Sequence, residues 1–368
     1  MSKGRVVLAM SGGVDSSVSA CLLTEQGYDV IGLFMRTGAA PEPTSCDTSS
    51  KSETSPKKIR GCCSAIDAAD AQRVADRLNI PFYALNFSEE FGRIKDYFVD
   101  EYLRGRTPNP CVVCNTWLKF GKLWEYAESV GADYIATGHY ARVERDESGE
   151  AGLFMADDST KDQSYFLFGI KGELLDRILF PIGNIPKSDV RQLAIERQLG
   201  VSKKPDSQEI CFVPTGNYLD FIHRHRPDLP DEPGEIVDHE GKKLATHNGI
   251  KSFTIGQRKG LGVAVGEPRY VVSLRPETQQ VVIGPRELLA QPSLQAERVN
   301  WLSRNPRTEP FRAEVKIRYL HRAVPALITP LENDQVRVDF DEPQQAVTPG
   351  QAVVFYRQMQ VLGGGWII

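Results

Sequence analysis

A glycine-rich turn carrying hydroxyl groups and one carboxylate follows the first apolar run of the sequence. Residues 6–10 (VVLAM) are typical of a strand buried on both faces, and residues 11–17 (SGGVDSS) come directly after it. Two glycines let the backbone turn tightly with bare N–H groups, and the positive end of the following helix favours an anion. We therefore predict a phosphate-binding turn in which the Asp15 carboxylate is placed to hold Mg²⁺.

Two common phosphate-binding loops do not fit this turn. It lacks the Gly-Lys-Ser/Thr ending that presents a lysine to phosphates, and it lacks the G-x-G-x-x-G spacing of dinucleotide sites. A glycine turn with a serine-capped helix is the purely structural interpretation. The complete SGGVDS run directly after a buried strand favours a nucleotide site instead.

The cysteines form the second group of residues that could do chemistry. Cys111 and Cys114 are spaced as Cys-x-x-Cys just ahead of a predicted helix start, where the pKa of a thiol falls. Cys211 lies far downstream in the polar run DSQEICF. No second pair of Cys or His accompanies the motif to complete a zinc tetrahedron. Redox, iron–sulfur and sulfur-transfer roles stay open for these three thiols.

The other four of the seven cysteines have weaker claims to a role. Cys21 has the spacing of a core residue on the first helix, and Cys46, Cys62 and Cys63 belong to or adjoin a polar stretch at residues 37–61. An odd count without an export signal is typical of reduced thiols rather than of a disulfide framework. No apolar run approaches the roughly 20 residues of a membrane span, so we expect a cytoplasmic protein.

Strands and helices alternate through the first part of the chain. The predicted strands occupy residues 6–10, 29–35, 81–87 and 133–137, and the predicted helices occupy residues 16–26, 65–78, 89–104 and 116–130. This order predicts an α/β fold with a doubly wound parallel sheet. Ligands of such sheets lie at the carboxyl ends of the strands, where the glycine turn and His139 also fall.

The pattern changes after residue 205. Short β-branched runs separated by Gly and Pro, such as YVVSL, QVVIG and QVRVDF, predict an all-β region. We expect one domain boundary near Pro214 and a second near Pro285. The predicted domains are therefore residues 1–213, 214–284 and 285–368.

Charge is unevenly distributed over the 368 residues. The 44 Lys and Arg residues are outnumbered by 48 Asp and Glu, and a net charge of −4 excludes a generally basic coat protein. Residues 304–322 nevertheless hold six Lys or Arg and only two Glu. Alternation places Lys316 and Arg318 on one face of a predicted strand at residues 311–319, with Tyr319 on the apolar face. The basic face is either a solvated surface or a phosphate-binding stripe.

Eight motifs occur together in one order along the chain. They read SGGVDSS, GLFMR, GCCS, RTPNPCVVCN, ATGHYAR, KDQSYFL, SQEICF and TIGQRKGLG. Together they resemble the tRNA-specific 2-thiouridylases, a family within the PP-loop ATP pyrophosphatase superfamily. The resemblance implies a PP-loop catalytic domain, a small central mostly β domain and a C-terminal β-barrel that binds tRNA.

The same resemblance implies an ATP-dependent sulfurtransferase that makes 2-thiouridine at the wobble position of tRNA. In this family the uracil O2 is adenylated with release of pyrophosphate, and sulfur from a cysteine persulfide then replaces AMP. Cys211 matches the persulfide position, and Cys114 matches the nucleophile that helps to release the sulfur. Asp15 matches a catalytic position. A disulfide between Cys114 and Cys211 is an expected product of the sulfur release.

Further site residues follow from matching the family's motifs. ATP binding is expected at Ala9, Met10, Ser11, Gly12, Gly13, Val14, Asp15, Ser16, Met35 and Gly138. Contact with tRNA is expected at Asn109, Pro110, Cys111, His139, Lys161, Asp162, Gln163, Arg318, Tyr319 and Gln351. The expected cofactors are ATP and Mg²⁺. The expected partners are tRNAs for lysine, glutamate and glutamine, and a sulfur-relay protein or cysteine desulfurase.

One departure from the family pattern bears on the mechanism. Many members carry an aspartate where this chain has Cys111, so an acid–base role at this position is in question. Cys111, Cys114 and Cys211 could instead hold a [4Fe–4S] cluster with one iron open to sulfide. Two rival functions also stay open: another PP-loop amide-forming ligase, and a non-catalytic iron–sulfur or tRNA-binding module.

Overall fold

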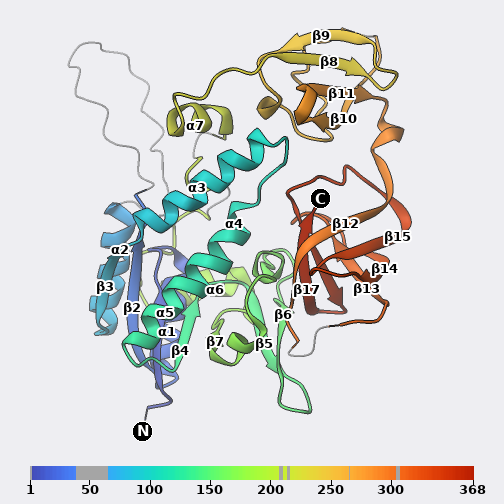
Figure 1. The fold of residues 1–368 in the computed structure, drawn as a ribbon. Coiled ribbons are helices and arrows are strands. Elements are labelled where there is room, and N and C mark those ends of the chain that lie inside the picture. The colour runs from blue at the N-terminus through green and yellow to red at the C-terminus, as the bar shows by residue number, and fades with distance from the viewer. Residues whose placement is uncertain (1, 39–64, 207–209, 214–215, 265, 304–306) are drawn as a thin grey trace, which may run out of the picture.

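The computed structural model describes residues 2–38, 65–206, 210–213, 216–264, 266–303 and 307–368. Three parts follow one another along the chain: an α/β domain, a small β domain and a β-barrel (Figure 1). These parts confirm the predicted fold class. Cys46, Cys62 and Cys63 lie outside the described residues, together with most of the predicted polar stretch.

Parallel strands form the sheet of the α/β domain, in the order β3-β2-β1-β4-β7. They are β1 (Arg5–Ala9), β2 (Asp29–Arg36), β3 (Phe82–Asn86), β4 (Tyr134–Thr137) and β7 (Ile178–Leu179). The helices α1 (Val14–Glu25), α2 (Ala65–Leu78), α3 (Ser88–Leu103) and α6 (Lys187–Glu196) cover the sheet. The strand order changes direction between β1 and β4, which is where such sheets bind ligands.

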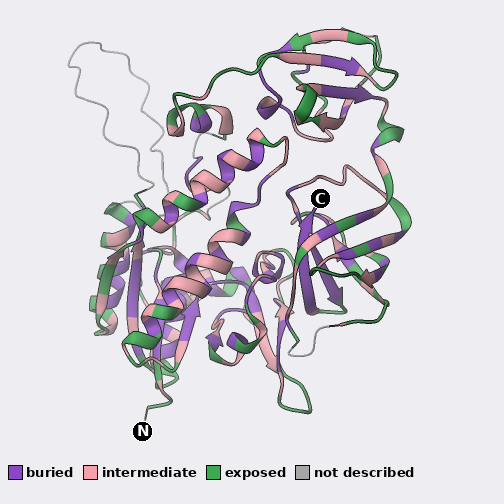
Figure 2. Ribbon diagram, viewed as in Figure 1, coloured by how far each residue is buried: buried purple, intermediate pink, exposed green. Residues whose placement is uncertain are grey.

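Alternate side chains of β1 fix the helices on both faces of the sheet. Val6 and Leu8 are fully buried in one core, which also contains residues of α1, α2 and α6. Val7 points to the opposite core, which contains residues of α3. Figure 2 shows β1 and β2 as buried ribbons between exposed helix faces. The predicted burial of the first strand on both faces is thus confirmed.

A continuous helical rod after α3 carries the Cys-x-x-Cys pair. It consists of α4 (Pro110–Val113), the π-helical segment η1 (Cys114–Lys122) and α5 (Leu123–Ser129). The Asn109 side chain caps the rod by accepting a hydrogen bond from the Val112 amide, and Pro110 suits the first turn. The predicted start at residue 116 is wrong, because this Asn-Pro pair begins the helix six residues earlier.

The small β domain begins with a helix. Its elements are α7 (Tyr218–His225), β8 (Gly234–Asp238), β9 (Lys243–His247), η4 (Ile250–Ser252), β10 (Tyr270–Arg275), η5 (Pro276–Thr278) and β11 (Gln280–Gly284). The strands pair in the order β10-β11-β8-β9. The prediction of an all-β region after residue 205 is wrong at α7. Asn217 caps this helix, and its Phe221 and Ile222 are buried in the core that contains α3.

The last part is a closed barrel. Its elements are η6 (Arg286–Leu289), β12 (Ala290–Trp301), β13 (Phe311–Lys316), β14 (Val324–Pro330), β15 (Val336–Gln345), β16 (Ala352–Arg357) and β17 (Gln360–Ile367). The strands follow the order β12-β15-β14-β13-β16-β17, and pairing of β12 with β17 closes the ring. The predicted strand at residues 311–319 is shorter, because β13 ends at Lys316. The alternation still holds beyond it, with Ile317 buried and Arg318 exposed.

A hairpin of the α/β domain joins the sheet of the barrel. β5 (Ala141–Arg145) and β6 (Ala151–Met155) pair antiparallel, and β6 also pairs with β17. The segments η2 (Ser164–Leu167) and η3 (Gly172–Arg177) follow the hairpin. The Tyr165 hydroxyl in η2 donates to the Ala352 carbonyl at 2.9 Å. The barrel is therefore attached to the α/β domain by strand pairing and by buried polar contact.

Candidate active site

The nucleotide turn, residues 11–16, lies at the carboxyl end of β1 beside β4. Gly12 has a φ of +71°, and a β-carbon there would lie 2.1 Å from the Asp67 carbonyl oxygen, so only glycine fits. Gly13 precedes the first residue of α1, and among the described residues no side chain caps this helix. The first N–H groups of α1 are therefore available to an anion.

Other predicted nucleotide-binding residues surround this turn. A β-carbon at Gly138 would lie 2.7 Å from the Ser16 amide nitrogen and 2.8 Å from the Asp15 carbonyl carbon. Gly138 is thus packed directly against the start of α1. Met35 is half-buried near the end of β2, whereas the Met10 side chain is buried in the core.

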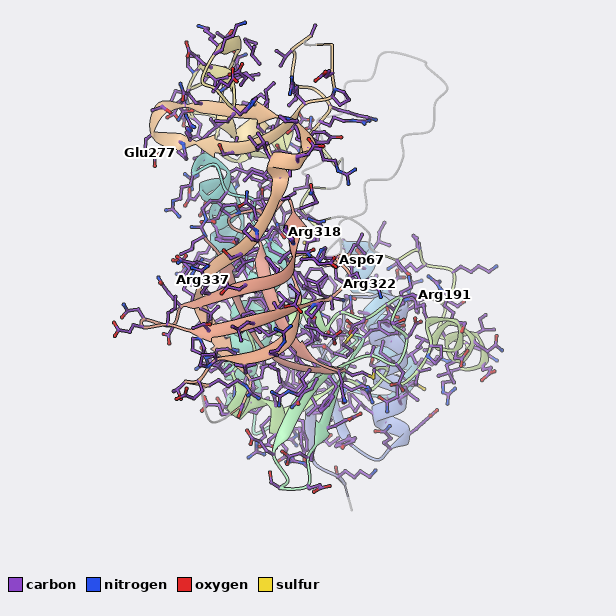
Figure 3. The ribbon with its side chains drawn as sticks, turned by 90° about the vertical axis from the view of Figure 1, so that its right-hand side faces the viewer. Asp67, Arg191, Glu277, Arg318, Arg322 and Arg337 are labelled. Atoms are coloured by element: carbon purple, nitrogen blue, oxygen red, sulfur yellow. The ribbon has the colours of Figure 1, made fainter. Side chains whose placement is uncertain are left out.

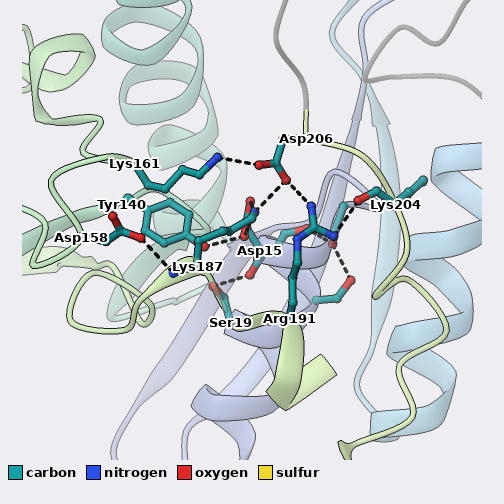
Figure 4. Close-up of polar contacts among 12 residues, drawn as sticks. Asp15, Ser19, Tyr140, Asp158, Lys161, Lys187, Arg191, Lys204 and Asp206 are labelled. Atoms are coloured by element: carbon teal, nitrogen blue, oxygen red, sulfur yellow. Dashed lines mark hydrogen bonds and ion pairs between the residues drawn. The ribbon is translucent and has the colours of Figure 1, made fainter. Parts of the chain in front are cut away.

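Two side chains hold the Asp15 carboxylate (Figure 4). Lys187 Nζ donates to its two oxygens at 2.7 and 2.8 Å, and the Tyr140 hydroxyl donates to Oδ1 at 2.9 Å. Burial and the charge of Asp15 raise the pKa of Tyr140, so the phenol stays a neutral donor. Carboxylate oxygens are the ligands that Mg²⁺ prefers, so the Asp15 carboxylate suits this ion. The Lys187 ammonium, which occupies both oxygens, would move away when Mg²⁺ binds.

A second carboxylate, Asp206, faces the same lysine. Its Oδ1 lies 3.1 Å from Lys187 Nζ and accepts a hydrogen bond from Arg191 at 2.6 Å. Its Oδ2 accepts one from Lys161 Nζ at 2.8 Å. Desolvation opposes the charge, but the hydrogen bonds from Lys161 and Lys187 lower the pKa of Asp206 to about 2. Asp206 is therefore ionised at neutral pH, and it joins Lys187, the counterion of Asp15, to two further cations, Lys161 and Arg191 (Figure 4).

Cys111 lies in the first turn of α4 and is exposed to solvent. Enough protein surrounds its sulfur for desolvation, followed by the charge of Cys114, to raise the thiol pKa to about 11. The positive charge of Lys119 acts in the opposite direction and is outweighed. The predicted lowering of the thiol pKa is therefore wrong for Cys111, which is protonated at neutral pH.

Cys114 and Cys211 are half-buried and pack against the same aromatic core. Phe212 lies in that core, with its ring centroid 4.8 Å from that of Phe221. Lys95 of α3 has its pKa lowered by desolvation, and the nearby charge of a Cys211 thiolate acts to raise it again. Lys95 thus lies close enough to Cys211 for the two groups to interact electrostatically.

The cysteines do not form a ready-made cluster site. Cys21, Cys111, Cys114 and Cys211 are all present as thiols. Across the described part of the chain, no three His, Cys, Asp or Glu side chains are grouped so that they could hold a metal ion. The arrangement gives the [4Fe–4S] alternative no support.

His139 is buried between two polar partners. Its Nδ1 lies 2.7 Å from Thr137 Oγ1, and its Nε2 lies 3.4 Å from Lys119 Nζ. Because an ammonium only donates, Nε2 accepts and Nδ1–H donates to Thr137. Burial, followed by the charge of Lys119, holds the pKa of His139 well below its usual value. His139 is thus a neutral acceptor that orients Lys119 on the helical rod of the cysteine pair.

The barrel braces the chain just before the cysteine pair. Gln351 Nε2 donates to the carbonyls of Thr107 and Pro108, both at 3.2 Å. The Thr107 amide donates to the Pro349 carbonyl at 2.8 Å. The predicted tRNA contact Gln351 therefore holds the approach to Asn109, which is another predicted contact.

Hydrogen bonds to the side chains of Asp162 and Gln163 fix the segment at residues 161–163. The buried Asp162 carboxylate accepts hydrogen bonds from the Ala156 amide at 3.1 Å and from the Ser164 hydroxyl at 2.9 Å. Gln163 accepts one from the Tyr140 amide at 2.9 Å. Desolvation raises the pKa of Asp162. Asp162 and Gln163 thus position the segment, while Lys161 keeps part of its charged side chain in solvent.

The predicted basic face lies on the barrel. Arg318 is exposed and donates to the Gln345 carbonyl at 3.2 Å. Figure 3 shows Arg318 and Arg322 at one edge of the barrel, with Arg337 on its other side in that view. Tyr319 is half-buried, and its ring centroid lies 4.5 Å from that of Phe166.

Four further charged residues belong to this site and were not predicted as site residues: Lys119, Lys187, Lys204 and Asp206. Lys187 directly follows a proline at a helix start, and the run KKPDSQEIC places Lys204 and Asp206 just ahead of Cys211. Their positions beside these features could have indicated that they belong to the site. Their partners lie on other elements, however, and no local spacing reveals such pairs.

The α/β domain has the fold and the anion-binding turn of an ATP-using PP-loop domain. Residues 4–215 match the family model described as a tRNA methyl transferase HUP domain. Residues 219–285 match a tRNA methyl transferase PRC-barrel domain, and residues 291–367 match an aminomethyltransferase beta-barrel domain.

Full-length relatives narrow this class to one family. The chain is 48% identical to the tRNA-specific 2-thiouridylase MnmA of Rhodopirellula baltica, with 99% of this chain and 96% of that protein covered. The corresponding protein of Carboxydothermus hydrogenoformans is 49% identical, with 99% and 97% covered. That of Geobacter metallireducens is 50% identical, with 99% and 96% covered. The chain belongs to the family of tRNA-specific 2-thiouridylases.

The raised pKa of Cys111 predicts how its reactivity changes with pH. Its alkylation by iodoacetamide should rise about tenfold per pH unit from about pH 7 to about pH 10, because only the thiolate reacts. Mass spectrometry of the Cys111 peptide at quenched time points measures this rate. N-acetylcysteine, a thiol of ordinary pKa, is the reference, and a Cys111 plateau below about pH 9 would contradict the raised thiol pKa.

The close packing of Gly138 predicts a loss of ATP affinity in Gly138→Ala. The added methyl group must displace the start of α1, so we expect at least about tenfold weaker ATP binding by isothermal titration calorimetry. Gly92→Ala is the matched control, since nothing lies within 4 Å of a β-carbon there. Equal ATP affinity in the two variants would show that the contact does not shape the nucleotide site.

Proposed function

We propose that the chain catalyses the ATP-dependent 2-thiolation of the wobble uridine of tRNA. The observation that carries this proposal is an uncapped helix start after the glycine turn, in a chain whose Cys114 and Cys211 thiols pack against one aromatic core. An ATP site and a pair of thiols are what adenylation followed by sulfur transfer requires. The substrate, the wobble uridine of tRNA, is inferred from membership of the thiouridylase family.

In the first half of the reaction, the nucleotide turn binds the phosphates of ATP. The oxygen O2 of uracil is a poor leaving group, and transfer of AMP onto it makes its departure easy. Amide N–H groups at the start of α1 and the serine hydroxyls bind phosphate oxygens. Asp15 would hold Mg²⁺, which neutralises phosphate charge when bound. Lys187 and Lys161 stabilise the departing pyrophosphate.

In the second half, sulfur replaces AMP. The terminal sulfur of a Cys211 persulfide attacks C2 of the adenylated uracil, and AMP leaves with O2. The Cys114 thiolate then attacks the Cys211 sulfur, breaks the bridging S–S bond and releases 2-thiouridine. The resulting Cys114–Cys211 disulfide is returned to two thiols by an external dithiol reductant.

The tRNA-facing residues come from both large domains. Asn109, Pro110 and Cys111 meet the target base, with Lys119 as a nearby positive charge. Lys161 and the basic edge of the barrel at Arg318 contact phosphates. The other predicted contact residues are half-buried or buried and support these contacts from within the protein: Tyr319, Gln351, His139, Asp162 and Gln163. The substrates are tRNAs for lysine, glutamate and glutamine, and a sulfur-relay protein or cysteine desulfurase supplies the persulfide.

We place this reaction in the cytoplasm. The mechanism needs reduced thiols and tRNA, and cytoplasmic glutathione and thioredoxin keep cysteines reduced. Within the described ranges, no helix has both the length and the apolar character of a membrane span.

The decisive experiment incubates the purified chain with unmodified tRNA, ATP, Mg²⁺, cysteine and a cysteine desulfurase. Nucleoside mass spectrometry should detect 2-thiouridine at the wobble position. Cys114→Ser and Cys211→Ser should each lose at least about 100-fold in thiolation rate, while tRNA-dependent pyrophosphate release continues in Cys211→Ser. Cys21→Ala, which changes a buried thiol outside the site, should keep its activity.

The outcomes separate the alternatives. Thiolation that survives in both serine variants would contradict the sulfur-relay role. Absence of tRNA-dependent pyrophosphate release in the wild type would indicate a binding module instead of an enzyme. Anaerobic purification with an iron assay tests the [4Fe–4S] alternative. An iron-free protein that thiolates tRNA excludes the cluster. Thiolation that requires iron excludes the persulfide route.

The exposed position of Arg318 predicts a salt-dependent defect in tRNA binding. Arg318→Ala should lower the slope of log K against log salt by about one, because one phosphate contact is lost. Filter binding at several salt concentrations measures the slope. Arg337→Ala, on the other side of the barrel, should keep the wild-type slope, and an unchanged slope in Arg318→Ala would remove this residue from the interface.

A further inference from the structure

Cys111 and Cys114 lie on one turn of the helical rod. Cys111 belongs to α4, and the Cys114 amide at the C-terminal end of this helix donates to the Cys111 carbonyl. Residues three positions apart on an α-helix share a face and have Cα atoms about 5 Å apart, which is a separation that a disulfide can bridge. Both side chains are present as thiols. The two sulfurs can therefore form a disulfide within this turn.

The three thiols of the site differ in exposure. Cys111 is exposed, whereas Cys114 and Cys211 are half-buried against the aromatic core. A disulfide between Cys114 and Cys211 would thus join two sulfurs that a reductant in solution reaches poorly. A disulfide that includes Cys111 has one exposed partner, and exposed disulfides are the ones that are reduced readily.

The charge around Cys111 changes when Cys114 enters a disulfide. Desolvation is the main cause of the raised thiol pKa of Cys111, and the negative charge of Cys114 adds to it. A sulfur held in a disulfide carries no charge, so the second effect is then removed. The ammonium of Lys119 still favours the Cys111 thiolate. Cys111 therefore becomes easier to ionise once Cys114 has been oxidised.

The π-helical winding of η1 keeps Lys119 near the cysteine pair. Cys114 and Lys119 are five residues apart, and the i→i+5 hydrogen bonds of a π-helix place residues of that spacing on the same side. An α-helix would turn them about 140° apart. The partner of Lys119 Nζ, at 3.4 Å, is Nε2 of the neutral His139 ring, which leaves the lysine charge uncompensated.

Resting on the proposed function, we propose that Cys111 is the resolving thiol of the reaction. After sulfur release, the Cys111 thiolate attacks Sγ of Cys114 in the Cys114–Cys211 disulfide. A bond forms between Cys111 and Cys114, and the bond to Cys211 breaks. Cys211 leaves as a thiolate and takes up the proton that Cys111 gave up, so the exchange needs no oxidant or reductant. The external dithiol then reduces the Cys111–Cys114 disulfide and is itself oxidised.

The exchange frees Cys211 before the reductant arrives. Cys211 is the thiol that accepts sulfur, so it can be loaded again while the oxidised pair awaits reduction. Cys111 thus has a use that an aspartate at this position could not supply.

The first test contains no tRNA. The reduced full chain is oxidised with one equivalent of diamide, the remaining thiols are trapped with N-ethylmaleimide, and non-reducing peptide mass spectrometry locates each disulfide. In the wild type, the Cys111–Cys114 disulfide should exceed the Cys114–Cys211 disulfide at least about tenfold. Cys111→Ser should form the Cys114–Cys211 disulfide instead. Cys21→Ala, which changes a buried thiol outside the site, should give the wild-type pattern.

The second test follows one turnover without reductant. The chain carrying a persulfide on Cys211 is mixed with tRNA, ATP and Mg²⁺ and quenched in acid over time, and each disulfide is expressed per 2-thiouridine formed. In the wild type, the Cys114–Cys211 disulfide should appear first and convert into the Cys111–Cys114 disulfide. In Cys111→Ser it should persist, at a final level at least about tenfold higher. Lys119→Met should slow the conversion at least about threefold, and Lys119→Arg should restore it.

The proposal is overturned if the wild type retains the Cys114–Cys211 disulfide in either test, or if Cys111→Ser frees Cys211 as the wild type does. Melting temperatures of all variants are measured in parallel, and the wild-type disulfide pattern decides alone if Cys111→Ser does not fold. A chain that forms the Cys111–Cys114 disulfide in the first test but makes no 2-thiouridine refutes the proposed function and leaves the exchange pair intact.

Discussion

The ammonium of Lys187 is the interaction on which the rest of the site depends. It pairs with the Asp15 carboxylate at the point where the chain passes from β1 into α1. Lys187 itself is the first residue of α6. Without it, two partly buried carboxylates would face each other without a shared counterion, which is costly in a partly desolvated site. One lysine thus brings the nucleotide turn, α6 and the chain toward Cys211 into a single electrostatic unit.

The parts of the structure that follow local rules could be predicted from the sequence. The strand β1 is recognisable by its continuous apolar run, and α2 ends at the predicted Leu78 because helical periodicity and burial agree. The start of α4 was missed because the Asn109 cap and Pro110 are also typical of an extended turn. The charged pairs of Lys187 and Asp206 could not be predicted, since their partners are distant in sequence and leave no periodic pattern.

The cysteine pair depends on contacts from two directions. The barrel holds the chain before Asn109 through Gln351, and the α/β domain holds Lys119 through the neutral ring of His139. The π-helical turns from Cys114 to Lys122 lie between these supports, and such turns are frequent at functional sites. The cysteine motif could be recognised from the sequence. The contacts by which the barrel positions it could not, because they join residues more than 200 positions apart.

The pairing of β6 with β17 has a consequence for how the protein is made. β6 ends at Met155, whereas its partner β17 begins only at Gln360. During synthesis the hairpin therefore leaves the ribosome with an open edge that stays uncovered until β17 has been translated. A chain truncated before β17 would keep this exposed strand edge, which invites aggregation.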